Sequence, residues 1–107
     1  MIRAEFFTTQ QGELLGFQIK GHAGAAKKGG DVVCAAVSSA AYMAANTITE
    51  ILHADAMADV DEEGGMFLRI SKKDAPNCSD LLKGFKLHLL ALEEQYPENI
   101  HVNYTEV

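Results

Sequence analysis

The sequence of 107 residues contains no tryptophan, two prolines and two cysteines. Two cysteines are too few for a small disulfide-stapled scaffold, so we expect both to be reduced thiols of a cytoplasmic protein. Basic side chains are also scarce, with 9 Lys and Arg against 15 Asp and Glu and a net charge of −6. A protein that binds the phosphate backbone needs clustered positive charge, so this balance argues against direct nucleic-acid binding and favours a basic partner.

The longest stretch without a charged residue covers residues 32–49, and its 18 residues approach the length of a membrane span. The stretch is rich in alanine and carries five hydroxyl or amide side chains, namely Ser38, Ser39, Asn46, Thr47 and Thr49. We therefore predict a buried helix of a soluble protein and no membrane partner. The N-terminus also lacks the apolar core and the small-residue cleavage site of a signal peptide.

Apolar and polar residues alternate in five segments, as they do in strands with one buried face. The predicted strands are residues 1–8, 14–20, 56–63, 66–72 and 100–104. The first two form a hairpin, and the next two form a second hairpin around Gly64 and Gly65.

Two helices are predicted at residues 32–53 and 80–96, because apolar residues recur there at steps of three and four. Asp31 and Ser79 are the expected N-caps. The buried stripe of the first helix is expected to contain Val37, Ala41, Ala44, Ile48 and Ile51. Cys78 then lies in the loop before the second helix.

These segments follow one another in the order β-β-α-β-β-α-β. Alternating strands need one covered face, and two helices are available to cover it. The sequence therefore predicts a two-layer α+β fold, with a mainly antiparallel sheet packed against two helices. The length fits a single domain that spans residues 1–107. The pattern does not predict the order of the strands.

A glycine-rich segment, residues 21–30, breaks this periodicity and is predicted to be a loop. It opens with Gly21, His22, Ala23 and Gly24 and leads to the first turn of the first helix, where we expect Cys34. The positive end of a helix dipole favours an anion, and thiols at helix N-termini are commonly reactive thiolates.

Cys34 and His22 together are the minimal apparatus for acyl transfer. The thiolate would attack a carbonyl carbon, and the imidazolium would protonate the leaving amine. Unpaired amides of the helix start, including that of Cys34, would hold the oxyanion. Asp31 either orients His22 or only caps the helix, and Ser38, one turn after Cys34, is placed to bond the site or the substrate backbone.

Other interpretations of the same residues remain open. A cysteine on an alanine-rich helix is commonly a small buried hydrophobe, and a histidine in a loop is commonly solvated. His22 and Cys34 supply too few ligands for a structural zinc ion, so we expect no metal and no cofactor. The acidic run fits a solvated hairpin face, although it would also attract a basic substrate; its members are Asp55, Asp59, Asp61, Glu62 and Glu63.

The motifs GHAG at residues 21–24 and DVVCAAVS at residues 31–38, together with the loop between them, closely resemble the ribosomal-processing cysteine protease family, Prp. The similarity extends over the whole chain. By position, His22 matches the catalytic histidine of the family and Cys34 its nucleophile. Asp31 and Ser38 match motif positions whose roles are less settled, and Gly21, Ala23 and Gly24 belong to the GHAG motif.

The resemblance implies a cytoplasmic bacterial endopeptidase. Members remove the N-terminal extension of a basic protein of the large ribosomal subunit, bacterial type number twenty-seven, by cutting after an aromatic residue. It also implies a homodimer. Two other functions are compatible with the residues alone: a non-catalytic ribosome-assembly factor, and a redox-sensing thiol module that forms a sulfenic acid at Cys34.

Overall fold

Five strands form a single sheet in the structure, a computed structural model that describes residues 1–21 and 30–107 and, after the gap, side chains from residue 32 onward. The strands are β1 (Ile2–Thr8), β2 (Leu14–Lys20), β3 (Ala56–Val60), β4 (Met66–Ile70) and β5 (Ile100–Glu106). Their order across the sheet is β3-β4-β2-β1-β5. All neighbours are antiparallel except β1 and β5, which are parallel. The five predicted strands and the mainly antiparallel sheet are confirmed.

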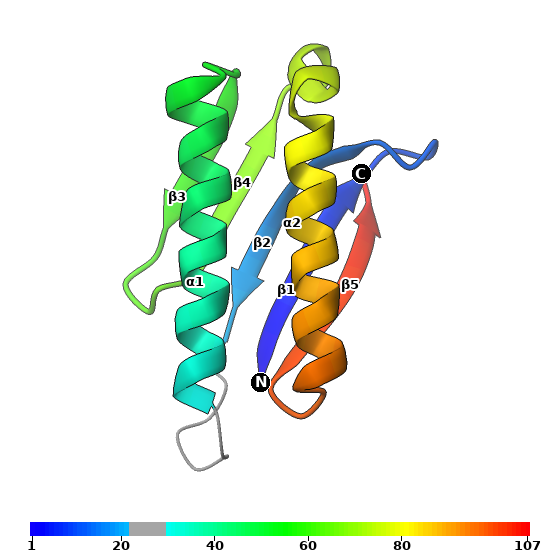
Figure 1. Ribbon diagram of the computed structural model, residues 1–107. Coiled ribbons are helices and arrows are strands. Elements are labelled where there is room, and N and C mark those ends of the chain that lie inside the picture. Colours follow the sequence, from blue (N-terminus) through cyan, green and yellow to red (C-terminus); the bar gives the residue numbers. More distant parts are fainter. Residues whose placement is uncertain (22–29) are drawn as a thin grey trace.

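Two long helices, α1 (Gly30–Asn46) and α2 (Ala75–Gln95), lie side by side on one face of the sheet (Figure 1). They run in opposite directions, so the start of α1 and the start of α2 lie at opposite ends of the molecule. The architecture is the two-layer α+β fold that the sequence predicts.

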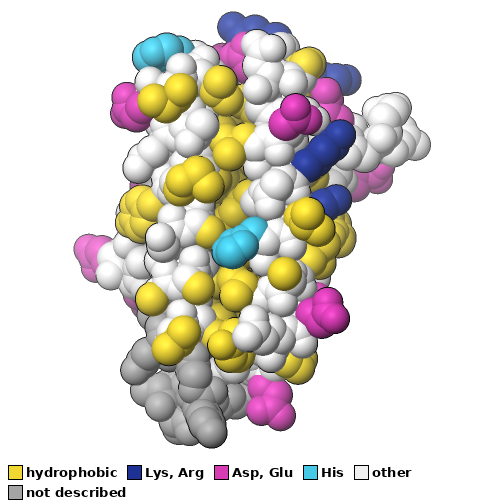
Figure 2. Space-filling model, in the orientation of Figure 1, with side chains coloured by type: hydrophobic (Ala, Val, Ile, Leu, Met, Phe, Trp, Pro, Cys, Tyr) yellow, Lys and Arg dark blue, Asp and Glu magenta, His cyan; other side chains and the backbone are white. Residues whose placement is uncertain are grey.

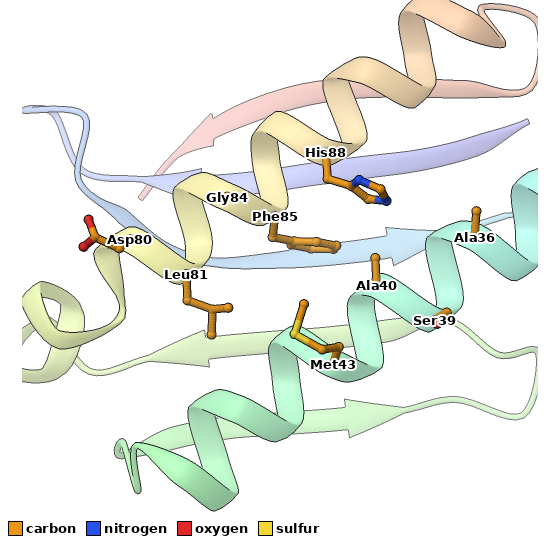
Figure 3. Close-up of a pocket in the computed structure, with 9 residues that line it drawn as sticks. All are labelled: Ala36, Ser39, Ala40, Met43, Asp80, Leu81, Gly84, Phe85 and His88. Atoms are coloured by element: carbon orange, nitrogen blue, oxygen red, sulfur yellow. The ribbon is translucent and has the colours of Figure 1, made fainter.

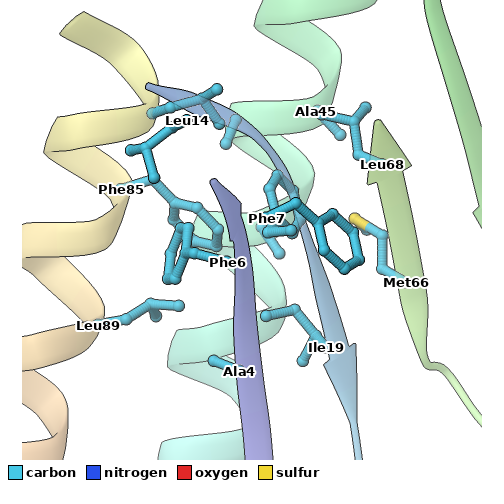
Figure 4. Packing of buried hydrophobic residues seen from close by; sticks show 14 of the residues in the cluster. Ala4, Phe6, Phe7, Leu14, Ile19, Ala45, Met66, Leu68, Phe85 and Leu89 are labelled. Carbon is cyan, nitrogen blue, oxygen red and sulfur yellow. The ribbon is translucent and has the colours of Figure 1, made fainter. Parts of the chain in front are cut away.

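Aromatic rings fill the space between the sheet and α2. Phe6 of β1 and Phe17 of β2 both pack edge-on against Phe85 of α2, with ring centroids 5.7 and 4.7 Å away. Figure 4 shows Phe6 and Phe85 facing each other across this layer. All three side chains are buried, and burial of large apolar side chains is the main stabilising contribution to such a core.

The C-terminal part of the first helix differs from the prediction. After Asn46 the chain forms a π-helical turn, η1 (Thr47–Ile51), which shifts the helical register. The Thr47 and Thr49 hydroxyls donate hydrogen bonds to carbonyls one turn earlier, a type of contact that bends helices. Ile48 is buried, but Ile51 is 71% exposed, so the prediction that Ile51 belongs to the buried stripe is wrong.

The second helix begins earlier than predicted. It starts at Ala75, directly after the 3₁₀ turn η2 (Lys72–Asp74), and Pro76 occupies its first turn. Proline is well tolerated there because the first-turn N–H groups need no intrahelical partner. Ser79 is therefore inside the helix and is not its N-cap, and Cys78 is a helical residue and not a loop thiol.

The apolar stretch that begins α1 packs on the sheet through a stripe of buried residues, Val33, Val37, Ala41, Ala44 and Ile48. By length and mean hydropathy, 1.4, the helical stretch Val32–Ile51 would also suffice to cross a membrane, and 33% of that window is buried in the fold. The low buried fraction reflects two flanks beside the stripe, one facing α2 and one, with the polar residues Asn46 and Thr49, facing β3.

Candidate active site

Cys34 lies near the start of α1, as the fifth residue of a helix that begins at Gly30. Among the helical residues at such a start, those whose amides have no intrahelical partner are residues 30–32. The expectation that the amide of Cys34 is itself unpaired is therefore wrong, because the helix begins before the predicted cap. The helical amides available to an anion precede Cys34 by two to four residues.

The side of α1 that carries Cys34 borders a small cavity of about 90 Å³. Three elements and two turns contribute to it. The lining residues are Ile2 of β1, Ile19 of β2, Gly21, Cys34, Val37 and Ser38 of α1, and Glu63, Gly64 and Gly65. Cys34 is partly exposed, and Ser38 is one helical turn further on the same side. The structure thus brings three predicted site residues together: Gly21, Cys34 and Ser38.

Gly21 follows the end of β2 and has a backbone conformation that excludes other residues. Its φ angle is +86°, in the left-handed region, and a Cβ atom there would collide with the backbone carbonyl oxygen of Met1. The chain therefore turns sharply at Gly21, directly beside the cavity that Cys34 lines.

The turn between β3 and β4 closes the cavity from the other side. Asp61 Oδ1 accepts hydrogen bonds from the N–H groups of Glu63 at 2.9 Å and Gly65 at 2.7 Å. Gly64 has a φ angle of +87°, and a Cβ atom on Gly65 would come within 2.5 Å of Asp61 Oδ2. Part of the acidic run is thus structural, since Asp61 holds the turn that places Glu63 at the cavity.

Sequence analysis did not predict that this turn meets Cys34. About thirty residues separate the two in the chain, and their contact depends on the strand order, which alternation does not reveal. Gly64 and Gly65 predicted a turn, but they did not indicate which residues that turn would contact.

Four predicted residues cannot be placed fully. His22, Ala23 and Gly24 lie outside the described residues. Asp31 is in the first turn of α1 and does not precede the helix as a cap would, and its side chain is outside the described part.

The other three histidines of the chain are described, and none of them lines the cavity of Cys34. His53 follows η1 with a φ angle of +51°. His101 Nδ1 is 3.5 Å from Glu93 Oε2, which also accepts a hydrogen bond from the N–H of Val102. His88 projects from α2 into a different cavity.

The second cysteine differs from the first in its exposure to solvent. Cys78 is completely buried in the core cluster, and both cysteines are reduced. Burial raises the pKa of the Cys78 thiol, and the nearby Asp74 carboxylate raises it further. Cys78 is thus a packing residue held in its neutral form.

A larger cavity, about 650 Å³, lies between α1 and α2 on the side away from the sheet. Figure 2 shows hydrophobic side chains along this channel, and Figure 3 shows Ala40 and Met43 of α1 facing Phe85 and His88 of α2. Ala36 also lines it, and two residues turn an α-helix by about 200°, so Cys34 lies on the opposite side of α1. The groove between the helices is therefore separate from the cavity of the thiol.

Comparison with known proteins agrees with this fold. The sequence profile of the family described as Cysteine protease Prp matches residues 1–101. The ribosomal processing cysteine protease Prp of Bacillus subtilis (strain 168) is 27% identical over 107 residues, with 95% of this chain and 96% of the relative covered.

Solved structures of the protein from S. aureus are similar over the same extent. The ribosomal processing protease Prp in complex with a substrate peptide has a TM-score of 0.86 and 26% identity, with 98% of this chain and 100% of that chain covered. The same protease with a covalently linked product peptide has a TM-score of 0.86 and 25% identity, with the same coverage. The chain therefore belongs to the Prp family and is a cysteine protease.

Proposed function

We propose that this protease removes the N-terminal extension of a basic protein of the bacterial large ribosomal subunit, type number twenty-seven, with Cys34 as its nucleophile. The relatives are named ribosomal processing proteases. The S. aureus relative holds a covalently linked product peptide, which supports a covalent mechanism. The observation that carries the proposal is that Cys34 is partly exposed at a helix start and lines a cavity with Gly21, while Cys78 is buried in the core.

In the first step the Cys34 sulfur attacks the carbonyl carbon of the scissile bond, and an S–C bond forms. The negative charge moves to the carbonyl oxygen, and the amides of residues 30–32 are the nearest helix-end donors for it. The C–N bond then breaks, and the amine leaves with a proton from His22. Water next attacks the thioester, His22 takes its proton, and the acid product and the Cys34 thiolate are released.

His22 is assigned as the acid and base on three grounds. The chain has four histidines, and the three described ones lie elsewhere. His22 directly follows Gly21, which lines the cavity of Cys34. The GHAG motif resembles the one that carries the catalytic histidine in the family.

The remaining site residues have supporting roles in this proposal. Ser38 borders the cavity and donates a hydrogen bond to the substrate backbone. Asp31 is in the first turn of α1, where a carboxylate complements the helix dipole, and it either orients His22 or serves this helical role alone. Gly21, Ala23 and Gly24 shape the segment that follows β2.

The test is cleavage of a peptide that spans the extension junction, followed by mass spectrometry. We expect the protein to yield two fragments cut after an aromatic residue. Cys34→Ala and His22→Ala should each lower kcat/KM by at least about 10³-fold, because neither nucleophile nor proton carrier has a substitute. Full turnover by Cys34→Ala would contradict the assignment of the nucleophile.

We also propose a cytoplasmic homodimer. The apolar groove between α1 and α2, with Met43 56% exposed on its rim, supports a second copy as its occupant. Met43→Glu should shift the sedimentation coefficient from that of a dimer toward that of a monomer. An unchanged coefficient would exclude this interface.

A further inference from the structure

Among the strands of the described residues, β3 is at the edge of the sheet, and β4 alone pairs with it. Four of its five residues are exposed, and Met57 and Val60 are 71% and 46% exposed. Figure 1 shows β3 at the side of the sheet, beside α1. An exposed edge offers a row of N–H and C=O groups, and extended peptides commonly bind proteins by adding a strand there.

A cavity of about 210 Å³ lies between this strand and α1. Its lining residues are Tyr42, Ala45, Asn46 and Thr49 of the helical segment, Ala58, Asp59 and Val60 of β3, and Met66 of β4. Pockets for drug-sized ligands are larger, about 300–1,000 Å³, so this cavity suits a single side chain. Most of the residues that line this cavity are apolar, so it suits an apolar side chain.

This cavity and the cavity of Cys34 lie on the same side of α1. Cys34, Ser38 and Tyr42 are spaced by four residues each, and residues four apart are neighbours on a helix face. The β3–β4 hairpin forms the opposite wall of both, with its turn at Cys34 and its edge strand at Tyr42. The two cavities thus follow one trough between α1 and the hairpin, and we call it the α1–β3 trough.

The length of the trough predicts a spacing along the substrate. From Cys34 to residues 42–46 the helix advances about 12–18 Å at 1.5 Å per residue. An extended peptide covers that distance in about four or five residues. A side chain in the Tyr42 cavity would thus belong to a residue four or five positions from the scissile bond.

The charges along the trough favour a basic chain. Glu63 lines the cavity of Cys34, and none of the described residues that line either cavity is Lys or Arg. Peptides from a basic ribosomal protein complement this surface.

We propose that the substrate lies in the α1–β3 trough as an extended strand beside β3, with an apolar side chain, four or five residues from the scissile bond, between Tyr42 and Ala58. This inference rests on the proposed function. It adds a binding site, and it states a specificity that the catalytic residues alone do not impose.

The test uses two exposed positions of β3. Ala58 faces the cavity, and Ala58→Trp would fill it. The adjacent Met57 points to the other face of the sheet, so Met57→Trp is a matched control. In a Cys34→Ala background, binding of a labelled junction peptide is measured by fluorescence anisotropy, and thermal unfolding checks that both variants are folded.

We expect Ala58→Trp to raise the Kd at least about 10-fold and Met57→Trp less than about 2-fold, because one buried apolar side chain contributes at least an order of magnitude in affinity. A second peptide carries Asp in place of an apolar residue four or five positions from the junction. This replacement should weaken binding to the protein with Ala58 intact by about as much as Ala58→Trp does. It should weaken binding to the Ala58→Trp variant only slightly. The proposed binding of substrate in the α1–β3 trough would be overturned if Ala58→Trp and Met57→Trp had equal Kd values. It would also be overturned if no peptide position on either side of the junction were sensitive to replacement by Asp. Peptide binding that needs Ala58, with no cleavage by the protein with Cys34 intact, would instead contradict the proposed function and leave the trough supported.

Discussion

The starts of the two helices each carry a cysteine, and the two thiols have opposite environments. Cys34 is the fifth residue of α1, and Cys78 is the fourth residue of α2. Cys34 is partly exposed and lines a cavity, whereas Cys78 has no exposed surface. The two helix starts lie at opposite ends of the molecule (Figure 1).

The difference shows that a helix start does not make a thiol reactive by itself. Both cysteines experience the positive end of a helix dipole. At α2, however, the thiol faces the core, and both burial and Asp74 favour the neutral form and raise its pKa. At α1, Cys34 packs at the edge of the core and lines the cavity that the β3–β4 turn closes, which leaves space for a substrate carbonyl. Packing around the helix start therefore decides which thiol can act.

The largest expected difference between Cys34 and Cys78 is in their rates of alkylation. In the folded protein at neutral pH, iodoacetamide should modify Cys34 at least about 100-fold faster than Cys78, because Cys78 is reached only when the core opens. Peptide mapping by mass spectrometry at successive times gives both rates. In denaturant the rates should converge, and similar rates in the folded protein would contradict the assigned difference.

Each cysteine also has a serine close by on its own helix. Substitution of the two serines is expected to give a smaller difference, in kcat/KM. Ser38 lines the cavity of Cys34, whereas Ser79 neighbours the buried Cys78. Ser38→Ala should lower kcat/KM about 5–10-fold, since a hydrogen bond to substrate contributes about 1 kcal/mol. Ser79→Ala should leave kcat/KM unchanged within error. Equal effects of the two substitutions would remove Ser38 from the site.

The sequence was a good guide to the elements and to the residues near Cys34. Alternation placed all five strands, because each has one face toward the helices, and Gly64 and Gly65 marked the second hairpin. Gly21, Cys34 and Ser38 do border one cavity, and they could be chosen because motif and helix spacing are local properties. His22 stays a prediction.

Properties that depend on distant contacts could not be predicted in this way. The strand order brings Glu63 to Cys34 and leaves β3 at the edge, and no local pattern encodes it. Ile51 has the spacing of a buried residue, but the π-helical turn rotates it into solvent. The predicted loop at Cys78 is wrong because Ser79 has the chemistry of an N-cap, although α2 begins at Ala75 with Pro76 in its first turn.

The smallest expected effect is a pH dependence of stability from Cys78. Removal of its sulfur by Cys78→Ala should lower the free energy of unfolding at pH 7 by about 1 kcal/mol, the order of one buried methylene group. The raised pKa of the folded Cys78 means that the unfolded chain loses its thiol proton first, above about pH 8.5, while the folded protein retains it. The contribution of Cys78 is therefore complete below that pH and declines as the pH rises toward the folded pKa.

Urea unfolding at pH 7 and pH 10, with and without the Cys78→Ala substitution in a Cys34→Ala background, gives the contribution of Cys78 at each pH. That contribution should shrink at the higher pH, and a constant or growing one would show that Cys78 is not held neutral by the core.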